Sequence, residues 1–423
     1  MGANKRTTMR IEVICTGDEV LTGKTVNTNF SMISQKLEDV GLAVQWETTV
    51  GDHREDLMLA FQLAGRRADA VIVNGGLGPT VDDLSQEIAA KAAGVELVLD
   101  EEWVSRMEAY FRSRGRVMPP NNRKQAMLPA GAERLDNPIG TACGFAVTIG
   151  KARFMFTPGV PREVRRMVDE QVIPRLLTMA GTQTTIHLKR FHSFGLGESR
   201  VDQMLAGVES LAPEGSVKLG FRAHYPQLET KLAVRGRDMD EVRRQLGPVE
   251  AEVRRRLGNF VLAEDDQTLE RNVLATLLEK NSSVAIVETF TGGQIAARLA
   301  PLPGADKVFR RATVGLDRSE LARSLGAAGH DAASVAAAAR TGAEATHALA
   351  VLVDLDEGQD RVEFGGTVHV AIVTAQGVAT RRSRLQGGRE WLRLGAIEMG
   401  LDCLRRHLAG LPVDERIDFE KVV

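Results

Sequence analysis

Apolar runs alternate with stretches of helical periodicity through the first 160 residues. The runs "RIEVICTG", "LAVQWETTVGD" and "DAVIVNG" predict buried strands, and "NTNFSMISQKLEDVG", "EDLMLAFQLAGRRA" and "DDLSQEIAAKAAG" predict the helices between them. Strands that alternate with helices of this length are typical of βαβ units. The pattern therefore predicts an α/β domain with a parallel sheet covered on both faces.

The next segments complete this first domain. "EEWVSRMEAYFRSRG" predicts an inserted helix, and "GFAVTIGKARFMFTPG" predicts a hairpin that returns to the sheet. "PREVRRMVDEQVIPRLLTMA" predicts the closing helix, with Pro161 at its start, where the missing N–H costs nothing.

Beyond Gly181 the pattern changes twice. A strand, a hairpin and an amphipathic helix predict a small α+β module, and the polar stretch "LAEDDQT" (262–268) predicts its boundary. The third part begins with the helix "LERNVLATLLEKN" and the strand "SSVAIVE", and it ends with a hairpin and a long helix. The alanine-rich run "AAGHDAASVAAAARTGAEATHALA" predicts a helix. The expected domains are residues 9–178, 181–262 and 266–412.

Composition narrows the class of protein. The 423 residues are 43% hydrophobic and 26% charged with a net charge of −2, so no global charge favours nucleic acid or membranes. We expect no nucleic-acid partner, because no basic stripe or aromatic platform is visible. The opening "MGANKRTTMR" resembles no signal peptide, and no apolar run approaches about 18 residues, so we expect a cytoplasmic protein. Three scattered cysteines predict neither a disulfide framework nor a zinc site.

The stretch "VIVNGGLGPTVDDLS" is the first candidate for chemistry. Gly75, Gly76 and Gly78 follow a predicted strand and precede a predicted helix. Glycines allow a positive φ and close approach, so that backbone N–H groups can face an anion beside the positive end of the helix dipole. The loop is either a phosphate site or only a tight turn.

Two carboxylates follow these glycines. Asp82 and Asp83 would repel phosphate, unless one caps the helix and the other holds a hard divalent cation that bridges to the phosphate. The combination of glycines and paired aspartates at a strand–helix junction favours a phosphate or metal site.

The first strand ends in a similar way. Thr16, Gly17, Asp18 and Glu19 are expected at the same sheet edge, and "NTN" (27–29) opens the next helix. Taken singly, these are ordinary turn and cap residues. Together with the glycine loop they predict a nucleotide pocket.

The longer motifs "TGDEVLTGKTVNTN", "NGGLGPTVDD", "NNRKQAMLPAGAERLDNPIGTACGF" and "FTPGVPREV" closely resemble the N-terminal domain of the CinA family. The resemblance covers roughly residues 10–175 and implies the three-layer αβα fold of molybdopterin-binding proteins. "FGLGES" (194–199) resembles the family's middle module. The remainder resembles, less well, the α/β C-terminal CinA domain, a nicotinamide-mononucleotide deamidase in active members.

This resemblance implies hydrolysis of the pyrophosphate in ADP-ribose, or a related nucleotide, with a divalent cation such as Mg²⁺, Mn²⁺ or Co²⁺. It also implies a homodimer. The expected catalytic residues are Asp18, Asp82 and Asp83, with Asp82 and Asp83 as metal ligands. The expected substrate-binding residues are Thr16, Gly17, Asn29, Gly75, Gly76, Gly78, Thr80, Arg123 and Lys124. One departure is Asn27, where family members commonly carry Asp.

The C-terminal part departs further from its family. In "ETFTGG", Thr289 stands where active members carry a nucleophilic serine, and Leu316 and Leu321 stand where they carry a tyrosine and a lysine. Leucine cannot activate a hydroxyl, so we expect the deamidase activity to be lost. "DLDEGQD" (354–360) replaces a family turn with aspartates that face an anion poorly. "GGTV" (365–368) and Arg389 survive, either as a remnant phosphate pocket or as parts that the fold needs.

A second class of function stays open. Both halves could bind ligands without turnover, sensing ADP-ribose-like nucleotides or binding a pterin phosphate. The carboxylates at Asp18, Asp82 and Asp83 favour catalysis, because a simple phosphate binder has little use for so many negative groups.

Overall fold

The computed structural model describes residues 9–181, 185–356 and 365–420. The chain forms two compact units, divided between His187 and Leu188. No helix among the described residues is long and apolar enough to cross a membrane.

The first unit is built on a six-stranded sheet. Its strands are β1 (Ile11–Thr16), β2 (Val44–Val50), β3 (Ala70–Asn74), β6 (Glu133–Leu135), β7 (Gly144–Ile149) and β8 (Ala152–Thr157), in the order β2-β1-β3-β8-β7-β6. The first four strands of this order run parallel, whereas β7 runs antiparallel to β8 and β6 runs antiparallel to β7. The predicted hairpin is thus confirmed, and β8 is the strand that returns to the centre of the sheet.

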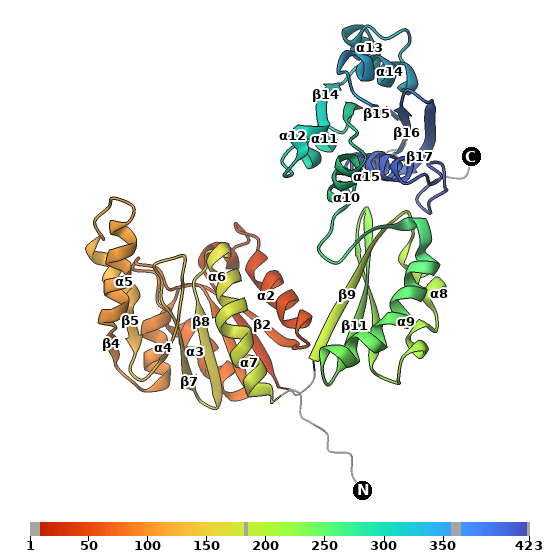
Figure 1. The fold of residues 1–423 in the computed structure, drawn as a ribbon. Helices are drawn as coiled ribbons and strands as arrows, with labels where there is room; N and C mark the ends of the chain where they lie inside the picture. The colour runs from red at the N-terminus through yellow and green to blue at the C-terminus, as the bar shows by residue number, and fades with distance from the viewer. Residues whose placement is uncertain (1–8, 182–184, 357–364, 421–423) are drawn as a thin grey trace. The chain divides into compact units, whose positions relative to one another are not determined.

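Helices cover both faces of this sheet (Figure 1). One hydrophobic cluster packs α2 (Thr28–Asp39), α6 (Pro161–Met167) and α7 (Ile173–Ala180) on one face. A second cluster packs α3 (Arg54–Arg67), α4 (Ser85–Ala93) and α5 (Glu101–Arg112) on the other. The expected three-layer αβα architecture is therefore present.

The start of α4 corrects one expectation. The sequence predicted a helix from Asp82, but α4 begins at Ser85, and its N-cap residue, Leu84, makes no side-chain cap. Asp83 instead accepts hydrogen bonds from the backbone N–H (2.9 Å) and the hydroxyl of Thr80. Because this turn uses the carboxylate locally, neither Asp82 nor Asp83 caps the helix.

The second unit contains two sheets. The first consists of β9 (Thr185–Phe194), β10 (Val217–His224), β11 (Gln227–Gly236) and β12 (Val261–Glu264), in the order β10-β11-β9-β12. It packs against α9 (Met239–Leu257) and against α8 (Glu198–Leu205), a short helix that the sequence did not predict. The stretch predicted as a polar boundary begins inside β12, where Leu262 and Ala263 are buried.

The second of these sheets consists of β13 (Val284–Thr289), β14 (Phe309–Gly315), β15 (His347–Leu355), β16 (Gly365–Val373) and β17 (Val378–Gln386), in the order β14-β13-β15-β16-β17. It packs against α10 (Leu269–Glu279), α14 (Ala332–Gly342) and α15 (Arg389–Leu408). Within the alanine-rich run, the helix is α14 alone. The last residues of the run enter β15, because small side chains suit a buried strand beneath a helix.

Candidate functional site

A cavity of about 600 Å³ lies at the carboxyl ends of β1, β3 and β8. Its walls comprise Thr16, Gly17, Glu19, Asp52, residues 75–79, Asp82, Asp83, Gln125, Thr141, Ala142, residues 158–161 and Glu163. In a parallel sheet, strand ends meet at one edge and the loops that follow form the ligand crevice. The structure thus brings the glycine loop, the paired aspartates and the end of β1 together.

The glycine loop passes very close to β1. Gly75 and Gly76 have φ angles of 116° and 68°. A Cβ atom at Gly75 would lie 2.5 Å from Thr16 Oγ1 and 2.9 Å from the Thr16 carbonyl oxygen, and one at Gly76 would lie 2.4 Å from Ser85 Oγ. Only glycine fits both the conformation and the space at Gly75 and Gly76.

The backbone N–H groups of the loop divide into two sets. The Gly75 N–H donates to the Thr157 carbonyl, and the Gly17 N–H donates to the Val50 carbonyl, so these two serve the fold. None of the described residues accepts a hydrogen bond from the N–H of Gly76, Leu77 or Gly78. These three groups are available to an anion in the cavity.

Thr16 adds a hydroxyl to the same wall. Thr16 is only 7% exposed. Its Oγ1 has no hydrogen-bond partner among the described residues. Buried hydroxyls are normally bonded, and an unpaired one costs about 1–3 kcal/mol. A ligand oxygen in the cavity would satisfy it.

Carboxylates dominate the charge of the cavity. Glu19, Asp52, Asp82, Asp83 and Glu163 line it, and among its described lining residues there is no lysine, arginine or histidine. Burial raises the pKa of Asp52, and the neighbouring charges of Asp18, Glu19 and Asp82 raise it further, against a hydrogen bond from Asp18. The site therefore repels anions and attracts cations.

Asp18 is not a lining residue. Its Oδ1 accepts a hydrogen bond from the Asp52 N–H, and its own N–H donates to Asp52 Oδ2, both at 3.2 Å. Asp18 thus supports Asp52, and it is Asp52 and Glu19 that face the cavity. The position of Asp52 directly after β2, at the same sheet edge, was the signal that the sequence analysis missed.

Four other expected binding residues lie outside the lining set. Arg123 contacts Glu101 at 3.5 Å, Lys124 donates to the Thr80 carbonyl, and Thr80 itself bonds Asp83. Asn29 donates to Asn74 Oδ1 (2.9 Å) and to the Gly159 carbonyl (2.7 Å), which joins two strand ends. These residues shape the walls instead of pointing into the cavity.

Gln125 lines the cavity where its neighbours Arg123 and Lys124 were expected to do so. It is buried, lines the cavity, and donates to the Leu77 carbonyl at 3.2 Å while accepting from Asn122 at 2.8 Å. It fixes the glycine loop from the far side. Asn27, in turn, caps α2 by accepting from the Phe30 N–H, so its departure from the family pattern affects a helix end.

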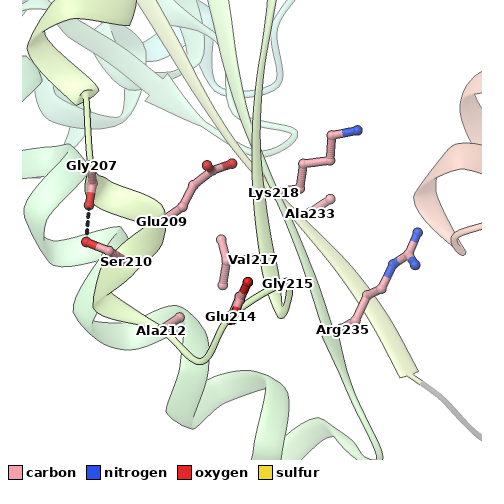
Figure 2. A pocket seen from close by; sticks show the side chains of 10 residues that line it. All are labelled: Gly207, Glu209, Ser210, Ala212, Glu214, Gly215, Val217, Lys218, Ala233 and Arg235. Atoms are coloured by element: carbon pink, nitrogen blue, oxygen red, sulfur yellow. Dashed lines mark hydrogen bonds between the residues drawn. The ribbon is translucent and has the colours of Figure 1, made fainter. Parts of the chain in front are cut away.

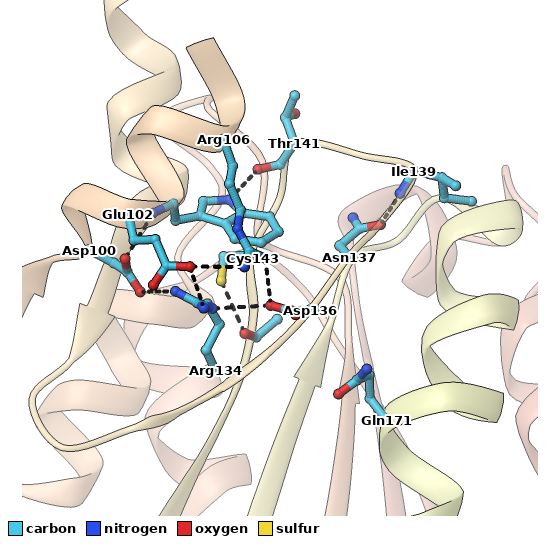
Figure 3. Close-up of polar contacts among 12 residues, drawn as sticks. Asp100, Glu102, Arg106, Arg134, Asp136, Asn137, Ile139, Thr141, Cys143 and Gln171 are labelled. Carbon is cyan, nitrogen blue, oxygen red and sulfur yellow. Dashed lines mark hydrogen bonds and ion pairs between the residues drawn. The ribbon is translucent and has the colours of Figure 1, made fainter. Parts of the chain in front are cut away.

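The segment 136–142 is anchored to α5 (Figure 3). Arg134 forms ion pairs with Asp100, Glu102 and Asp136, and Trp103 Nε1 donates to the Thr141 carbonyl at 2.9 Å. Because Thr141 lines the cavity, the inserted helix holds one wall in place.

The donor set limits how a metal could bind. Over the described ranges 9–181, 185–356 and 365–420, no group of three or more His, Cys, Asp and Glu side chains could hold a metal ion alone. Mg²⁺, however, is usually bound by one or two carboxylates together with substrate phosphates and water. The carboxylates of the cavity fit a cation that binds together with a phosphate ligand.

The C-terminal candidate site is arranged differently. Thr289 is 3% exposed, and its Oγ1 accepts a hydrogen bond from the Val353 N–H at 3.0 Å. Leu321 is buried in the core, whereas Leu316 is 95% exposed. The Arg389 guanidinium lies over the Phe290 ring, 5.5 Å from its centroid. The structure does not gather these residues around an exposed hydroxyl.

The segments of this region that match the family pattern make contacts that stabilise the fold. Glu288 accepts hydrogen bonds from Thr291 Oγ1 and from the N–H groups of Ile295 and Ala296, at the start of α11 (Gln294–Leu299). A Cβ atom at Gly366 would lie 2.6 Å from both the Asp354 carbonyl oxygen and Leu392 Cδ2. These contacts favour the structural interpretation of "GGTV".

Within the segment "DLDEGQD", the described aspartates are neutralised by cations. Asp354 forms an ion pair with Arg318 and a hydrogen bond with His369, and Asp356 forms an ion pair with Arg384. Residues 357–360 of this segment lie outside the described residues.

A larger cavity, of about 920 Å³, lies in the middle module (Figure 2). Two of its polar side chains bond within the fold: Ser210 Oγ donates to the Gly207 carbonyl, and Glu209 accepts from the Leu219 N–H. Lys218 and Arg235 are accompanied by Glu209 and Glu214, so the charge is mixed. The first cavity is therefore the stronger candidate.

Comparison with known proteins covers nearly the whole chain. Three family models match: the probable molybdopterin binding domain over residues 12–178, the damage-inducible protein CinA KH domain over 188–263, and the CinA C-terminal domain over 266–408. A "CinA-like protein" of Shewanella sediminis is 37% identical over 416 residues, 95% of this chain and 96% of the relative.

Two further proteins are similar to this chain. A "CinA-like protein" of Shewanella woodyi is 38% identical, again over 95% of this chain and 96% of the relative. The crystal structure of the protein CinA from Thermoplasma acidophilum is 32% identical and covers 40% of this chain and 98% of its own, with a TM-score of 0.36.

Proposed function

The chain belongs to the CinA family, and we propose that its N-terminal domain hydrolyses the diphosphate of ADP-ribose, or of a related nucleotide, with a divalent cation. Water would add across the P–O–P linkage and give AMP and ribose 5-phosphate. The observation that supports this most is that five carboxylates line the cavity beside three backbone N–H groups from which no described residue accepts a hydrogen bond. Such a site suits a diphosphate only when a cation accompanies it.

The residues would divide the work by charge. The N–H groups of residues 76–78 and the Thr16 hydroxyl would donate to phosphate oxygens. Asp82, with Glu19 or Asp52, would hold the cation. When bound, a divalent cation neutralises phosphate charge and lowers the pKa of a coordinated water.

Product analysis tests this proposal. The full chain is incubated with ADP-ribose and Mg²⁺, Mn²⁺ or Co²⁺, with a chelator as the reference, and AMP is followed by chromatography. We expect metal-dependent AMP release. If ADP-ribose binds and no AMP forms with any of the three metals, the protein is a sensor. The family model named for molybdopterin binding supports a pterin phosphate as the second candidate ligand.

Thr16→Val separates binding from stability. Because the buried hydroxyl has no hydrogen-bond partner among the described residues, its removal is expected to raise the free energy of unfolding by about 1 kcal/mol. The same change is expected to weaken ADP-ribose binding about 10-fold, since a donor to phosphate is lost. Chemical denaturation and calorimetry measure the two effects. A variant that loses stability and keeps its affinity would contradict this role for Thr16.

We propose further that the C-terminal domain has lost the deamidase activity of its family. The Thr289 hydroxyl is buried and accepts from backbone, and the leucines at 316 and 321 offer no base. The purified chain is expected to release no ammonia from nicotinamide mononucleotide. The Thr289→Ala variant is expected to give the same result. Ammonia release that Thr289→Ala abolishes would refute this.

A further inference from the structure

Glu163 is the one carboxylate of the cavity that follows β8. It lies in the first turn of α6, whose N-terminal residues line the cavity. In the strand order, β8 lies two strands from β1, which leads to Glu19, and three from β2, which leads to Asp52. With neighbouring strands about 4.8 Å apart, these strand ends are separated by roughly 10 to 14 Å. Glu163 therefore stands apart from Glu19 and Asp52, whereas Asp82 and Asp83 follow β3, the strand next to β8.

Asn137 holds Glu163 in a fixed orientation. Asn137 is 3% exposed, and its Nδ2 donates to Glu163 Oε2 at 2.8 Å and to the Ala142 carbonyl at 3.0 Å. Its Oδ1 accepts from the N–H groups of Ile139 (Figure 3) and Gly140. All four hydrogen bonds that an amide can make are thus formed, and the two backbone donors fix which end of the amide faces Glu163.

Gly140 leaves the space for this contact. A Cβ atom there would lie 2.1 Å from Glu163 Oε2 and 2.6 Å from Asn137 Nδ2. The pair is therefore built into the loop, and Asn137 occupies one oxygen of the carboxylate while Glu163 remains part of the cavity wall.

The chemistry of the carboxylate limits what it can bind. An ionised carboxylate only accepts hydrogen bonds, and so do phosphate oxygens. A carboxylate of the wall that does not hold the cation must therefore meet donors. The vicinal hydroxyls of a ribose are such donors, and acidic side chains serve this purpose in dinucleotide-binding folds.

We infer that Glu163 binds the ribose hydroxyls of the nucleotide and that Asn137 is the residue that positions it. This inference rests on the proposed nucleotide function and assigns the specificity of the same site. Glu163 selects a ribosylated diphosphate over a bare one.

Calorimetry with two probes in the presence of Mg²⁺ tests the inference on the full chain. The probes are ADP-ribose and inorganic pyrophosphate, which lacks ribose. Glu163→Gln is expected to weaken ADP-ribose binding about 10- to 100-fold, the range for a hydrogen bond to a charged group, and to leave pyrophosphate binding within about twofold. Asn137→Ala is expected to lower the same preference for ADP-ribose, which a general loosening of the loop would not do.

Glu170→Gln is the matched control, because Glu170 follows α6 in the same helical run and pairs with Arg166, without lining the cavity. It should change neither affinity. If Glu163→Gln weakens both probes equally, or neither, the inference is overturned while the proposed function stands. If the wild-type chain binds neither probe, the proposed function fails, and this inference fails with it.

Discussion

Asp82→Asn is expected to lower the rate of ADP-ribose hydrolysis by at least about 100-fold while the fold is retained. Asp82 is an exposed lining residue, and Asp83 is the one that accepts hydrogen bonds from both the backbone N–H and the hydroxyl of Thr80 in this turn. Loss of even an outer-shell partner of a metal typically costs about 10- to 100-fold, and loss of a ligand should cost more. The rate of AMP release at saturating Mg²⁺ measures the effect.

Two further variants make this result specific. Asp83→Asn is expected to lower both activity and thermal stability, because the carboxylate also accepts hydrogen bonds from Thr80. Asp56→Asn changes an exposed aspartate on α3 and should affect neither. Unchanged turnover in Asp82→Asn would remove this carboxylate from the mechanism.

Gly75→Ala is expected to lower the free energy of unfolding by about 3 kcal/mol and to abolish nucleotide binding. The backbone at Gly75 has a φ of 116°, and the added methyl group would meet both the hydroxyl and the carbonyl oxygen of Thr16. Strain of this kind costs about 1–3 kcal/mol, and overpacking adds to it. The displaced loop would also move the N–H groups that face the cavity.

Gly94→Ala supplies the matched control. Gly94 ends α4 with a φ of 71°, but a Cβ atom there would have nothing within 4 Å. Gly94→Ala is therefore expected to lower the free energy of unfolding by only about 1–2 kcal/mol, the cost of a left-handed backbone conformation for alanine. It adds no steric clash and lies away from the cavity. Chemical denaturation of both variants separates the two contributions. Equal losses of stability would contradict the close packing of the loop on β1.

The layers and the sheet edge could be predicted from sequence because they depend on local patterns. Alternating apolar and periodic segments fix βαβ units, and the rule that loops at the carboxyl edge form the crevice brings Thr16 and Gly75 together. The family motifs supplied the rest of the fold.

The exact wall of the cavity could not be predicted, because it depends on where side chains bond. The carboxylates of Asp18 and Asp52 each accept a hydrogen bond from the other residue's backbone N–H, and it is Asp52, not Asp18, that lines the cavity. Arg123 and Lys124 bond elsewhere, while the less conspicuous Gln125 faces inward. Charged residues that a sequence suggests as ligand-binding can instead form hydrogen bonds or ion pairs with their neighbours in the fold.

In the C-terminal domain, too, the sequence predicted which residues differ from the family but not the contacts that they make. The sequence has leucines at positions 316 and 321, where the resemblance to active family members implies a tyrosine and a lysine. Two contacts in this domain could not be predicted. The Thr289 hydroxyl accepts a hydrogen bond from the Val353 N–H because of the strand register, and Arg389 lies over Phe290 because α15 begins at Arg389.

The most direct test of the electrostatic account is calorimetric titration of the full chain with ADP-ribose, with Mg²⁺ or Mn²⁺ and again with a chelator. A cavity with five carboxylates and no cationic lining residue among those described should bind the nucleotide only when the divalent cation is present. Equal affinity in the chelator would show that the diphosphate needs no cation there, and the account would be wrong.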